Sequence, residues 1–310
     1  MQFKKPIFWD KKFSVWKYLL LPLSYIYFFF SKINFKKKHT VNGIFSICVG
    51  NIYVGGTGKT PSCLLLKKIL ERLDIKSCFI KKNYSNQIDE QNLLSKYGDL
   101  FVEKIRLSAL IKSKNQGYKV AIFDDGFQDK SINYNLKIVC FNSENFIGNG
   151  NLIPSGPLRE KISAVKSCDA VFLNGLSLNN KKNIDKLKTI NPSIKVFETI
   201  YKMQDIENLD KSAKYLIFAG ISNPINFFNL LKNNNINIVK RIFYADHYIY
   251  NEEDIEKIKK ISVKENLKII TTEKDYCRLN KSMREDINYV KIELSLQNEK
   301  EFIDFLKNKI

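Results

Sequence analysis

The feature that most constrains the fold is a glycine-rich segment, residues 50–61 (GNIYVGGTGKTP), which lies between a strand-like run and a helix-like run. Residues 44–49 (IFSICV) are mostly apolar and rich in β-formers, and residues 63–73 have helical length and composition. Strand, glycine loop and helix form the context of a phosphate-binding loop, in which backbone N–H groups and the helix N-terminus converge on an anion. The segment therefore predicts a nucleotide-phosphate site in an α/β domain.

The end of this segment carries the chemistry. Lys59 is expected to reach the terminal phosphates of a nucleotide, and the Thr60 hydroxyl to hold Mg²⁺. The strict pattern GxxxxGK[ST] requires glycine where this chain has Tyr53, so the identification depends on the residues that follow. The predicted cofactor-binding residues are Gly55, Gly56, Thr57, Gly58, Lys59 and Thr60. The alternative is a chance Gly-Lys-Thr in a loop, which the flanking strand and helix make the poorer interpretation.

Length, charge and cysteine usage narrow the class. A chain of 310 residues is long enough for two domains. Lys and Arg number 51 against 32 Asp and Glu, a net charge of +19, which suits nucleic acid, an anionic membrane or an anionic substrate. Because lysines recur throughout, much of this excess can be solvated surface. The six cysteines are scattered without a CxxC pair, which predicts buried thiols in a reducing compartment and no structural metal.

The most hydrophobic stretch is residues 13–30 (FSVWKYLLLPLSYIYFFF), which Lys17 and Pro22 interrupt. Its 18 residues are at the lower limit for a bilayer-spanning helix, and its aromatic side chains suit a membrane interface. Residues 1–40 hold nine lysines against one acid, Asp10. We expect a helix embedded in, or lying on, the cytoplasmic leaflet of a membrane. The alternative is a helix packed on the protein's own core.

A pair of acidic residues follows a second apolar run. Residues 118–123 (YKVAIF) lead into Asp124 and Asp125. A carboxylate at the carboxyl end of a strand, beside a phosphate-binding loop, is the Walker B arrangement that orients Mg²⁺. An ordinary strand followed by an Asp-Gly turn is the alternative. Read together with the glycine loop, the pattern predicts a metal site formed by Thr60, Asp124 and Asp125.

Three further residues are candidates for the chemistry. Arg159 lies in a loop rich in glycine and proline, residues 148–160, and either binds phosphate in bidentate fashion or pairs with Glu160 at the surface. Asp89 either caps the helix that begins there or has a catalytic role. His247 follows a predicted strand, where α/β sheets place ligands, but a lone histidine is more often structural.

The pattern along the chain predicts three segments. Residues 1–36 form a membrane-associated N-terminal segment, and residues 37–205 form a P-loop domain of the nucleoside-triphosphatase type. A polar stretch near residue 205 (MQDIENLDKSAK) is read as a linker. Residues 206–310 alternate between strand-like and helix-like runs and are predicted to form a smaller α/β domain without a glycine loop of its own.

In their order along the chain, these motifs resemble those of the tetraacyldisaccharide 4'-kinases, a family that phosphorylates a lipid A precursor at the inner membrane. The resemblance covers nearly the whole chain and includes the aromatic N-terminal helix, and the family's loop also lacks the first Walker glycine. The matching motifs are Gly50-Asn51, Gly55 to Pro61, Asp124-Asp125-Gly126-Phe127-Gln128, Gly148-Asn149-Gly150, Pro154 to Glu160, Ala219-Gly220-Ile221, Asn223-Pro224, Asp246-His247 and Thr272-Glu273-Lys274-Asp275.

The resemblance implies ATP and Mg²⁺ as cofactors. It implies transfer of the γ-phosphoryl group to the 4'-hydroxyl of an anionic acylated disaccharide lipid, a tetraacyl glucosamine disaccharide 1-phosphate, at the cytoplasmic face of the bacterial inner membrane. Asp89 is then the base that accepts the hydroxyl proton, and His247 supports it. The resemblance also makes Lys59 and Thr60 the ligands of the phosphate loop, Asp124 and Asp125 the acidic pair, and Arg159 and Arg106 phosphate ligands.

The chain departs from the family pattern at three places. The family's Ser-Arg-Gly-Tyr is here Lys81-Lys82-Asn83-Tyr84, with the positive charge kept at Lys82. Its Gln-His is Gln128-Asp129, and its Asp-His-His is Asp246-His247-Tyr248.

Two other classes remain as alternatives. A membrane-surface ATPase switch of the partitioning type shares a Gly-Gly-x-Gly-Lys-Thr loop, but that type carries lysine immediately before the glycine pair, where this chain has Val54. A basic nucleic-acid binder is less favoured, because the sequence has no recognisable aromatic-basic platform or recognition helix. We therefore expect no nucleic-acid partner.

Overall fold

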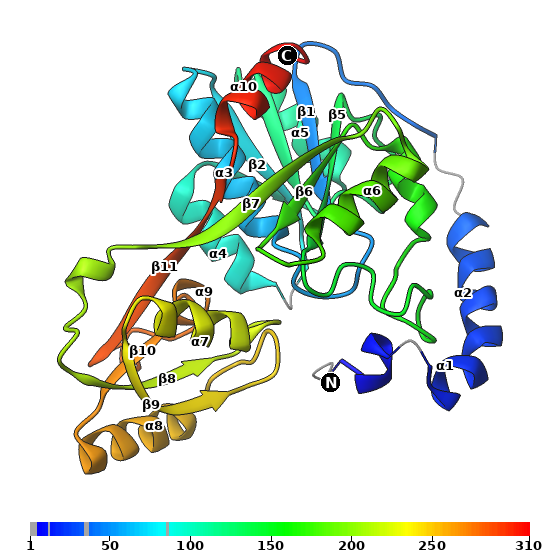
Figure 1. Ribbon diagram of the computed structural model, residues 1–310. Coiled ribbons are helices and arrows are strands. Elements are labelled where there is room, and N and C mark those ends of the chain that lie inside the picture. Colours follow the sequence, from blue (N-terminus) through cyan, green and yellow to red (C-terminus); the bar gives the residue numbers. More distant parts are fainter. Residues whose placement is uncertain (1–4, 12, 34–36, 85–86) are drawn as a thin grey trace. The chain divides into compact units, whose positions relative to one another are not determined.

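The computed structural model describes residues 5–11, 13–33, 37–84 and 87–310 (Figure 1). The chain forms two compact units, each assembled from segments that are not continuous in sequence. The larger unit comprises Lys5–Asn83, Gly98–Ile200 and Leu294–Ile310, and the smaller unit includes Tyr84–Tyr97 and Tyr201–Glu293. The segments predicted from sequence, 37–205 and 206–310, are by contrast continuous.

The larger unit is built on a parallel sheet. Its strand order is β3–β2–β4–β1–β5–β6–β7, and each strand runs parallel to its neighbours in this order. The strands are β1 (Phe45–Gly50), β2 (Ser77–Lys82), β3 (Leu100–Glu103), β4 (Val120–Asp124), β5 (Leu136–Asn142), β6 (Ala170–Asn174) and β7 (Lys195–Gln204). Every residue of β4 and β6 is buried, which is why these strands read as continuous apolar runs in the sequence.

Helices cover both faces of this sheet. Phe123 of β4 packs in one cluster with α5 (Arg106–Asn115), and Leu173 of β6 packs in another with α6 (Asn180–Ile190). On β6 the preceding residue, Phe172, faces the other way and contacts Phe302 of α10 (Glu299–Lys307), with ring centroids 5.1 Å apart. The helix α3 (Lys59–Arg72), which follows the glycine loop, packs on β1, β2 and β4.

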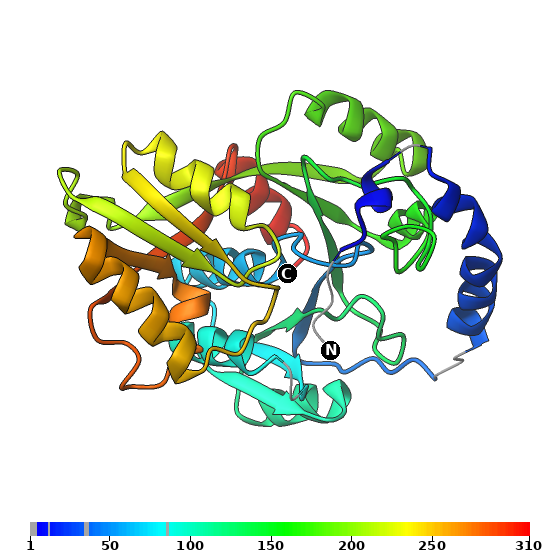
Figure 2. The same ribbon diagram turned by 90° about the horizontal axis from the view of Figure 1, so that it is seen from below.

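The smaller unit repeats the same layered architecture. Its parallel strands run in the order β11–β10–β8–β9, with bounds β8 (Lys214–Ala219), β9 (Asn237–Phe243), β10 (Lys268–Thr272) and β11 (Ile287–Leu296). The helices α7 (Pro224–Asn233) and α8 (Glu252–Glu265) lie on opposite faces of these strands (Figure 2). Alternate residues of β8 explain this, since Ile217 packs with α7 and Phe218 with α8. The α/β class predicted from the sequence is confirmed.

Two short helices complete the smaller unit. The helix α4 (Ile88–Tyr97) precedes β3 in the chain but packs with α9 (Glu273–Tyr276). Lys96 and Tyr97 of α4 both contact the carboxylate of Glu273, with Tyr97 Oη 2.9 Å from Oε2. These bonds tie the inserted segment to the C-terminal strands.

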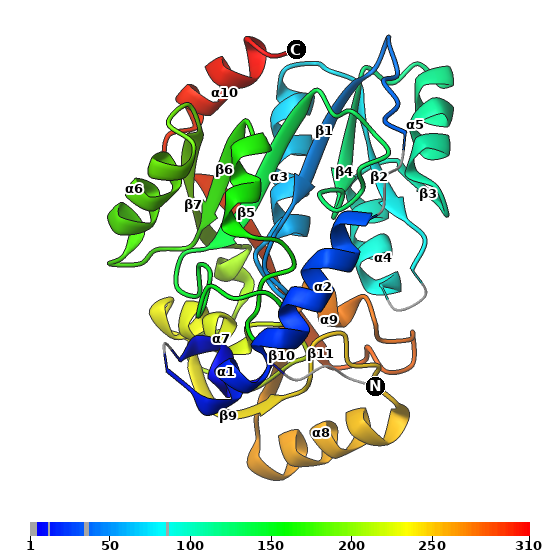
Figure 3. The ribbon, with the colours of Figure 1, turned by 90° about the vertical axis from the view of Figure 1, so that its right-hand side faces the viewer.

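The predicted apolar stretch 13–30 forms two helices, α1 (Val15–Leu19) and α2 (Leu21–Ile33), which follow the 3₁₀ turn η1 (Ile7–Asp10) (Figure 3). Pro22 falls in the first turn of α2, where its missing N–H is tolerated. Among the described residues, no helix combines the length and the apolar character needed to cross a bilayer. Residues 1–4, 12 and 34–36 of the predicted N-terminal segment lie outside the described residues.

The helix α2 has one face on the protein and one face exposed. Ser24 Oγ donates to the backbone O of Leu152 at 2.9 Å, and the Tyr27 hydroxyl donates to the backbone O of Arg159 at 3.2 Å. The exposed face carries large apolar side chains: Leu23, Tyr25, Ile26, Phe29 and Phe30. The helix is therefore packed on the core, as one alternative predicts, and also presents an unusual apolar surface.

Candidate active site

The glycine loop connects β1 to α3, as the sequence predicts. Gly58 is the N-cap of α3 and has φ 84°, a left-handed conformation that glycine adopts without strain. Asn51 Nδ2 donates to the backbone O of Tyr53 at 2.6 Å and to Thr57 Oγ1 at 2.9 Å. From the other side, Asn174 Nδ2 donates to the backbone O of Thr57 at 2.6 Å. These two buried amides hold the loop in shape.

Tyr53, which replaces the first Walker glycine, is a core residue. It is buried in an apolar cluster with Ile52, Leu152 and Leu158, and it forms an isolated β-bridge with Leu158. The departure from the strict pattern therefore anchors the phosphate loop to the 148–160 loop.

The predicted metal ligands lie at the carboxyl end of β4. Thr60 Oγ1 donates to Asp124 Oδ2 at 3.3 Å, so these two residues are brought together. The next residue, Asp125, has a backbone φ of 56°, which is uncommon for residues other than glycine. A hydroxyl and carboxylates are hard oxygen donors of the kind Mg²⁺ prefers. Within the described residues there is no group of three or more His, Cys, Asp or Glu side chains that could hold a metal ion.

Asp125 is surrounded by cations. Lys59 Nζ lies 3.7 Å from Asp125 Oδ1, and Arg159 Nη1 lies 3.2 Å from each carboxylate oxygen. Burial alone raises the pKa of Asp125, but the charges of Lys59 and Arg159 outweigh it and lower the pKa to about 2. Asp125 is therefore ionised at neutral pH, and its carboxylate draws Arg159 toward the phosphate loop.

Arg106 bonds to the acidic turn, the segment that follows β4 (residues 125–129). Its Nη2 donates to the backbone O of Asp125 at 2.7 Å, and its Nη1 lies 3.4 Å from Asp129 Oδ2. Asp129, one of the departures from the family pattern, also accepts a hydrogen bond from Ser131 Oγ at 2.6 Å. The aspartate thus has a structural partner in Arg106.

Sequence reasoning missed Lys81. It placed the retained charge at Lys82, but the Lys81 ammonium Nζ lies 2.6 Å from Asp124 Oδ2, and both side chains are buried. The available signal was a lysine inside the otherwise apolar and buried strand β2.

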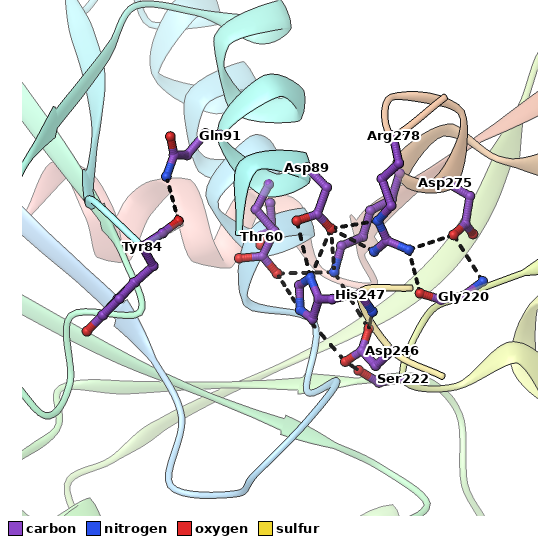
Figure 4. A network of polar contacts seen from close by, with 12 residues as sticks. Thr60, Tyr84, Asp89, Gln91, Gly220, Ser222, Asp246, His247, Asp275 and Arg278 are labelled. Carbon is purple, nitrogen blue, oxygen red and sulfur yellow. Dashed lines mark hydrogen bonds and ion pairs between the residues drawn. The ribbon is translucent and has the colours of Figure 1, made fainter. Parts of the chain in front are cut away.

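A second cluster lies within the smaller unit (Figure 4). Asp89 stands in the first turn of α4, and its carboxylate is buried. His247 Nδ1 lies 3.0 Å from Asp89 Oδ2 and 3.2 Å from Oδ1. The side chains of Asp89 and His247, which the resemblance pairs, are thus in direct contact.

Arg278 is a further member of this cluster that sequence reasoning missed. Its Nη2 and Nε donate to Asp89 Oδ2 at 2.6 and 3.1 Å, and its Nη1 donates to Asp275 Oδ1 at 2.7 Å. The backbone O of Gly220 accepts from both Arg278 Nη1, at 2.6 Å, and the His247 N–H, at 3.1 Å. A side chain at position 220 would meet Tyr250 Oη at 2.9 Å, so glycine permits this close approach.

The charges in this cluster favour an ionised Asp89. Burial alone raises the pKa of its carboxyl, but the hydrogen bond from His247 and the charges of Lys274 and Arg278 hold the pKa well below its usual range. Lys274 Nζ lies 3.5 Å from Asp89 Oδ2 and 3.2 Å from Glu90 Oε1. The carboxylate is therefore available as an acceptor at any physiological pH.

His247 is held by its backbone as well as by Asp89. Its φ is 56°, and its N–H also contacts Asp246 Oδ1 at 3.1 Å. Because an ionised Asp89 can only accept a hydrogen bond, Nδ1 carries the hydrogen of this contact. Nε2 lies 3.8 Å from both Glu90 Oε1 and Asp246 Oδ2. Tyr248, the third departure, donates from its hydroxyl to Asp254 Oδ2 at 3.0 Å.

All six cysteines are free thiols, and five of them are buried. Burial raises the pKa of Cys48 and Cys63 well above the usual value, so these thiols stay protonated.

A glycine loop that leads into α3, with an acidic pair at the end of the neighbouring strand β4, defines a P-loop nucleotide-binding protein of the α/β class. The family model for tetraacyldisaccharide-1-P 4'-kinase (LpxK) matches residues 16–99 and 88–310. The chain belongs to this family.

Named relatives agree over nearly the whole chain. A tetraacyldisaccharide 4'-kinase of Pelagibacter ubique (strain HTCC1062) is 48% identical over 301 residues, which cover 97% of this chain and 96% of the relative. One of Rickettsia canadensis (strain McKiel) is 33% identical over 317 residues, with 94% and 93% covered. The crystal structure of Aquifex aeolicus LpxK in complex with ATP has a TM-score of 0.71 at 20% identity and covers 94% of this chain and 99% of its own. That last likeness concerns the fold.

Proposed function

We propose that the chain transfers the γ-phosphoryl group of ATP to the 4'-hydroxyl of a tetraacyl glucosamine disaccharide 1-phosphate, a lipid A precursor. The observation that carries the proposal is that a chain of this family brings together two separate sets of polar residues. One set is a phosphate loop with an acidic pair, and the other is a carboxylate bonded to a histidine and an arginine.

The nucleotide half of the reaction uses residues 55–60 as the phosphate cradle. Lys59 and Arg159 supply positive charge where negative charge spreads over the transferring phosphoryl group. When bound, Mg²⁺ supplies charge neutralisation at the phosphate oxygens, and Thr60, Asp124 and Asp125 are the residues that would hold it. Arg106 keeps the acidic turn in place through its bond to the backbone O of Asp125.

The acceptor half uses Asp89. Its carboxylate accepts the proton of the 4'-hydroxyl as the new O–P bond forms and the bond to the ADP leaving group breaks. Because phosphoryl transfer has a loose transition state, little proton transfer is needed before the O–P bond forms, and a carboxylate with a low pKa suffices. His247 fixes the carboxylate through its Nδ1–H, and Arg278 keeps the carboxylate ionised until the hydroxyl proton arrives.

The proposed substrate carries acyl chains, so we expect the enzyme to meet it at a membrane surface. We infer that the N-terminal segment 1–36 docks on the cytoplasmic face of the bacterial inner membrane. The exposed apolar side chains of its described part support this: Phe13, Val15, Trp16, Tyr18 and Leu19, together with the exposed face of α2. The nine lysines among residues 1–40 would add attraction to anionic lipid.

The test is a transfer assay with purified full-length chain, γ-labelled ATP, Mg²⁺ and the tetraacyl disaccharide 1-phosphate in mixed micelles. The label is expected in the lipid, and its transfer should require the free 4'-hydroxyl. ATP turnover that never labels the lipid would instead favour an ATPase switch.

A further inference from the structure

Lys81 is a fully buried lysine near the carboxyl end of β2, and 1% of its side chain is exposed. In the parallel pairing of β2 with β4, Ile80 lies opposite Phe123, so Lys81 and Asp124 are the next residues along the two strands. Their charged atoms, Nζ and Oδ2, are 2.6 Å apart. Removing an ammonium from water is costly unless a carboxylate pairs with it, so each charge depends on the other for its burial.

The same carboxylate faces the phosphate loop. Thr60 Oγ1 donates to Asp124 Oδ2 at 3.3 Å, and Cys63 Sγ lies 3.9 Å from Oδ1. One oxygen of Asp124 therefore contacts both a hydroxyl proposed as a metal ligand and the Lys81 ammonium. Lys81 is buried behind this carboxylate, so its closest charged contact in the site is Asp124, and its charge also lowers the pKa of Asp125.

We propose that Lys81 is a positioning residue that holds the Asp124 carboxylate beside Thr60 and, as a fixed positive charge, weakens the binding of the divalent ion that accompanies ATP. The inference rests on the proposed use of Mg²⁺ with ATP. Two cations that share one carboxylate repel each other, so an incoming divalent ion meets a carboxylate that is already partly neutralised.

Lys81 acts differently on the site without nucleotide and on the site with nucleotide. Without nucleotide, Lys81 satisfies the buried charge of Asp124 and stabilises the fold. With nucleotide, the phosphates bring the negative charge that the site needs to retain the ion. Lys81 is thereby expected to limit how tightly the ion is held both with and without ATP, and the phosphates of ATP supply the additional attraction.

The test compares full-length Lys81→Met with Lys119→Met, which removes the same charge from an exposed side chain just before β4. Mn²⁺ serves as the probe, and its free concentration is followed by electron paramagnetic resonance. Titrations are run with and without the non-hydrolysable analogue adenosine 5'-(β,γ-imido)triphosphate. Lys81→Met is expected to bind Mn²⁺ at least about threefold more tightly than the native chain in both titrations. Its Tm without metal should fall by about 5 °C or more.

The control variant Lys119→Met should match the native chain in both measurements. Unchanged or weaker Mn²⁺ binding in Lys81→Met would overturn the proposal. Neither Mn²⁺ binding nor Tm involves the lipid. A negative Mn²⁺ result would therefore not count against lipid phosphorylation, and a negative lipid assay would not change the Mn²⁺ comparison.

A double-mutant cycle tests separately whether the two charges are coupled. Should Lys81→Met alone fail to fold, a double variant that folds with a measurable Tm is the expected result, and a double variant that also fails to fold would contradict the pair. Lys81→Met with Asp124→Asn removes both charges and keeps similar volumes. The double variant is expected to recover most of the Tm that either single change loses. A double variant destabilised by the sum of the two single losses would contradict the pair.

Discussion

His247 Nδ1 lies 3.0 Å from Asp89 Oδ2, although the two residues are 158 positions apart in the chain. The contact forms because the segment Tyr84–Tyr97 belongs to the same compact unit as residues Tyr201–Glu293. Arg278, from the turn after α9, donates a hydrogen bond to the same carboxylate oxygen, Asp89 Oδ2. Asp89 is therefore held by two elements of the smaller unit rather than by its own helix.

Replacing Asp89 with Asn should slow phosphoryl transfer while leaving nucleotide binding nearly intact. The amide keeps the shape of the side chain but cannot accept the hydroxyl proton, so kcat should fall by about 10²–10⁴-fold. The Kd for ATP, measured by calorimetry, should change by less than about twofold, because Asp89 is not part of the phosphate loop.

Lys59→Met gives the contrasting pattern, because Lys59 is expected to contact the phosphates. Its kcat/KM for ATP should fall by at least about 10²-fold. A normal kcat in the Asp89→Asn variant would rule out Asp89 as the base.

Removing the Arg278 charge should make stability less dependent on acid. The folded-state pKa of Asp89 is lowered by His247, Lys274 and Arg278, against opposing charges on Glu90 and Asp275. The ionised Asp89 carboxylate contributes its full stabilisation above a pH of about 4, the pKa of an aspartate in the unfolded chain. This stabilisation is lost as the pH falls from there toward the lower pKa of Asp89 in the folded state. Arg278→Met should cost about 3 kcal/mol at pH 7, because it removes the cation that two buried carboxylates, Asp89 and Asp275, share.

The measurement is urea unfolding of both proteins at pH 7 and at pH 3.5. The difference in unfolding free energy should shrink at the lower pH, where Asp89 of the variant becomes protonated. Arg278→Lys should restore part of the loss. A difference that stays the same at both pH values would argue against charge pairing as the role of Arg278.

Membrane binding should depend on the exposed face of α2. Phe29 and Phe30 are each 65% exposed, so Phe29→Ser with Phe30→Ser removes apolar surface without removing contacts to the core. Recovery of the variant with anionic phospholipid vesicles should fall by about tenfold, since burying each phenyl ring contributes about 1.5–3 kcal/mol at most. Deleting the helix is less informative, because Ser24 and Tyr27 hold it to the 148–160 loop.

Val263→Ser is the matched control for this experiment. Val263 is an exposed apolar residue of α8, in the other compact unit. Its variant should sediment with vesicles as the native chain does. Equal recovery of the phenylalanine variant and the control would favour a helix whose role is confined to packing.

Much of the fold was predictable because its signals are local. The glycine loop and the buried strand before Asp124 each lie within a dozen residues, and Thr60 and Asp124 are in contact in the structure. The Asp89–His247 pair was expected through resemblance alone, because no periodicity links residues on separate elements. Lys81 and Arg278 were missed because a lysine or arginine at an element's end usually faces solvent, and only the tertiary structure shows the carboxylate that each one meets.

The N-terminal stretch illustrates a different limit. Its composition indicates a long apolar helix, but the stretch forms two helices, α1 and α2. One face of α2 is held on the protein by hydrogen bonds from Ser24 and Tyr27. Hydropathy sums over all faces of a helix, whereas packing depends on which face meets the protein.

The central claim is most directly tested by following the label from γ-labelled ATP into the tetraacyl disaccharide 1-phosphate, with the native chain and Asp89→Asn side by side. We predict labelled lipid with the native chain, a rate lower by at least about 10²-fold with the variant, and no label in a substrate whose 4'-hydroxyl is blocked. ATP hydrolysis by the native chain with no label in the lipid would contradict the account.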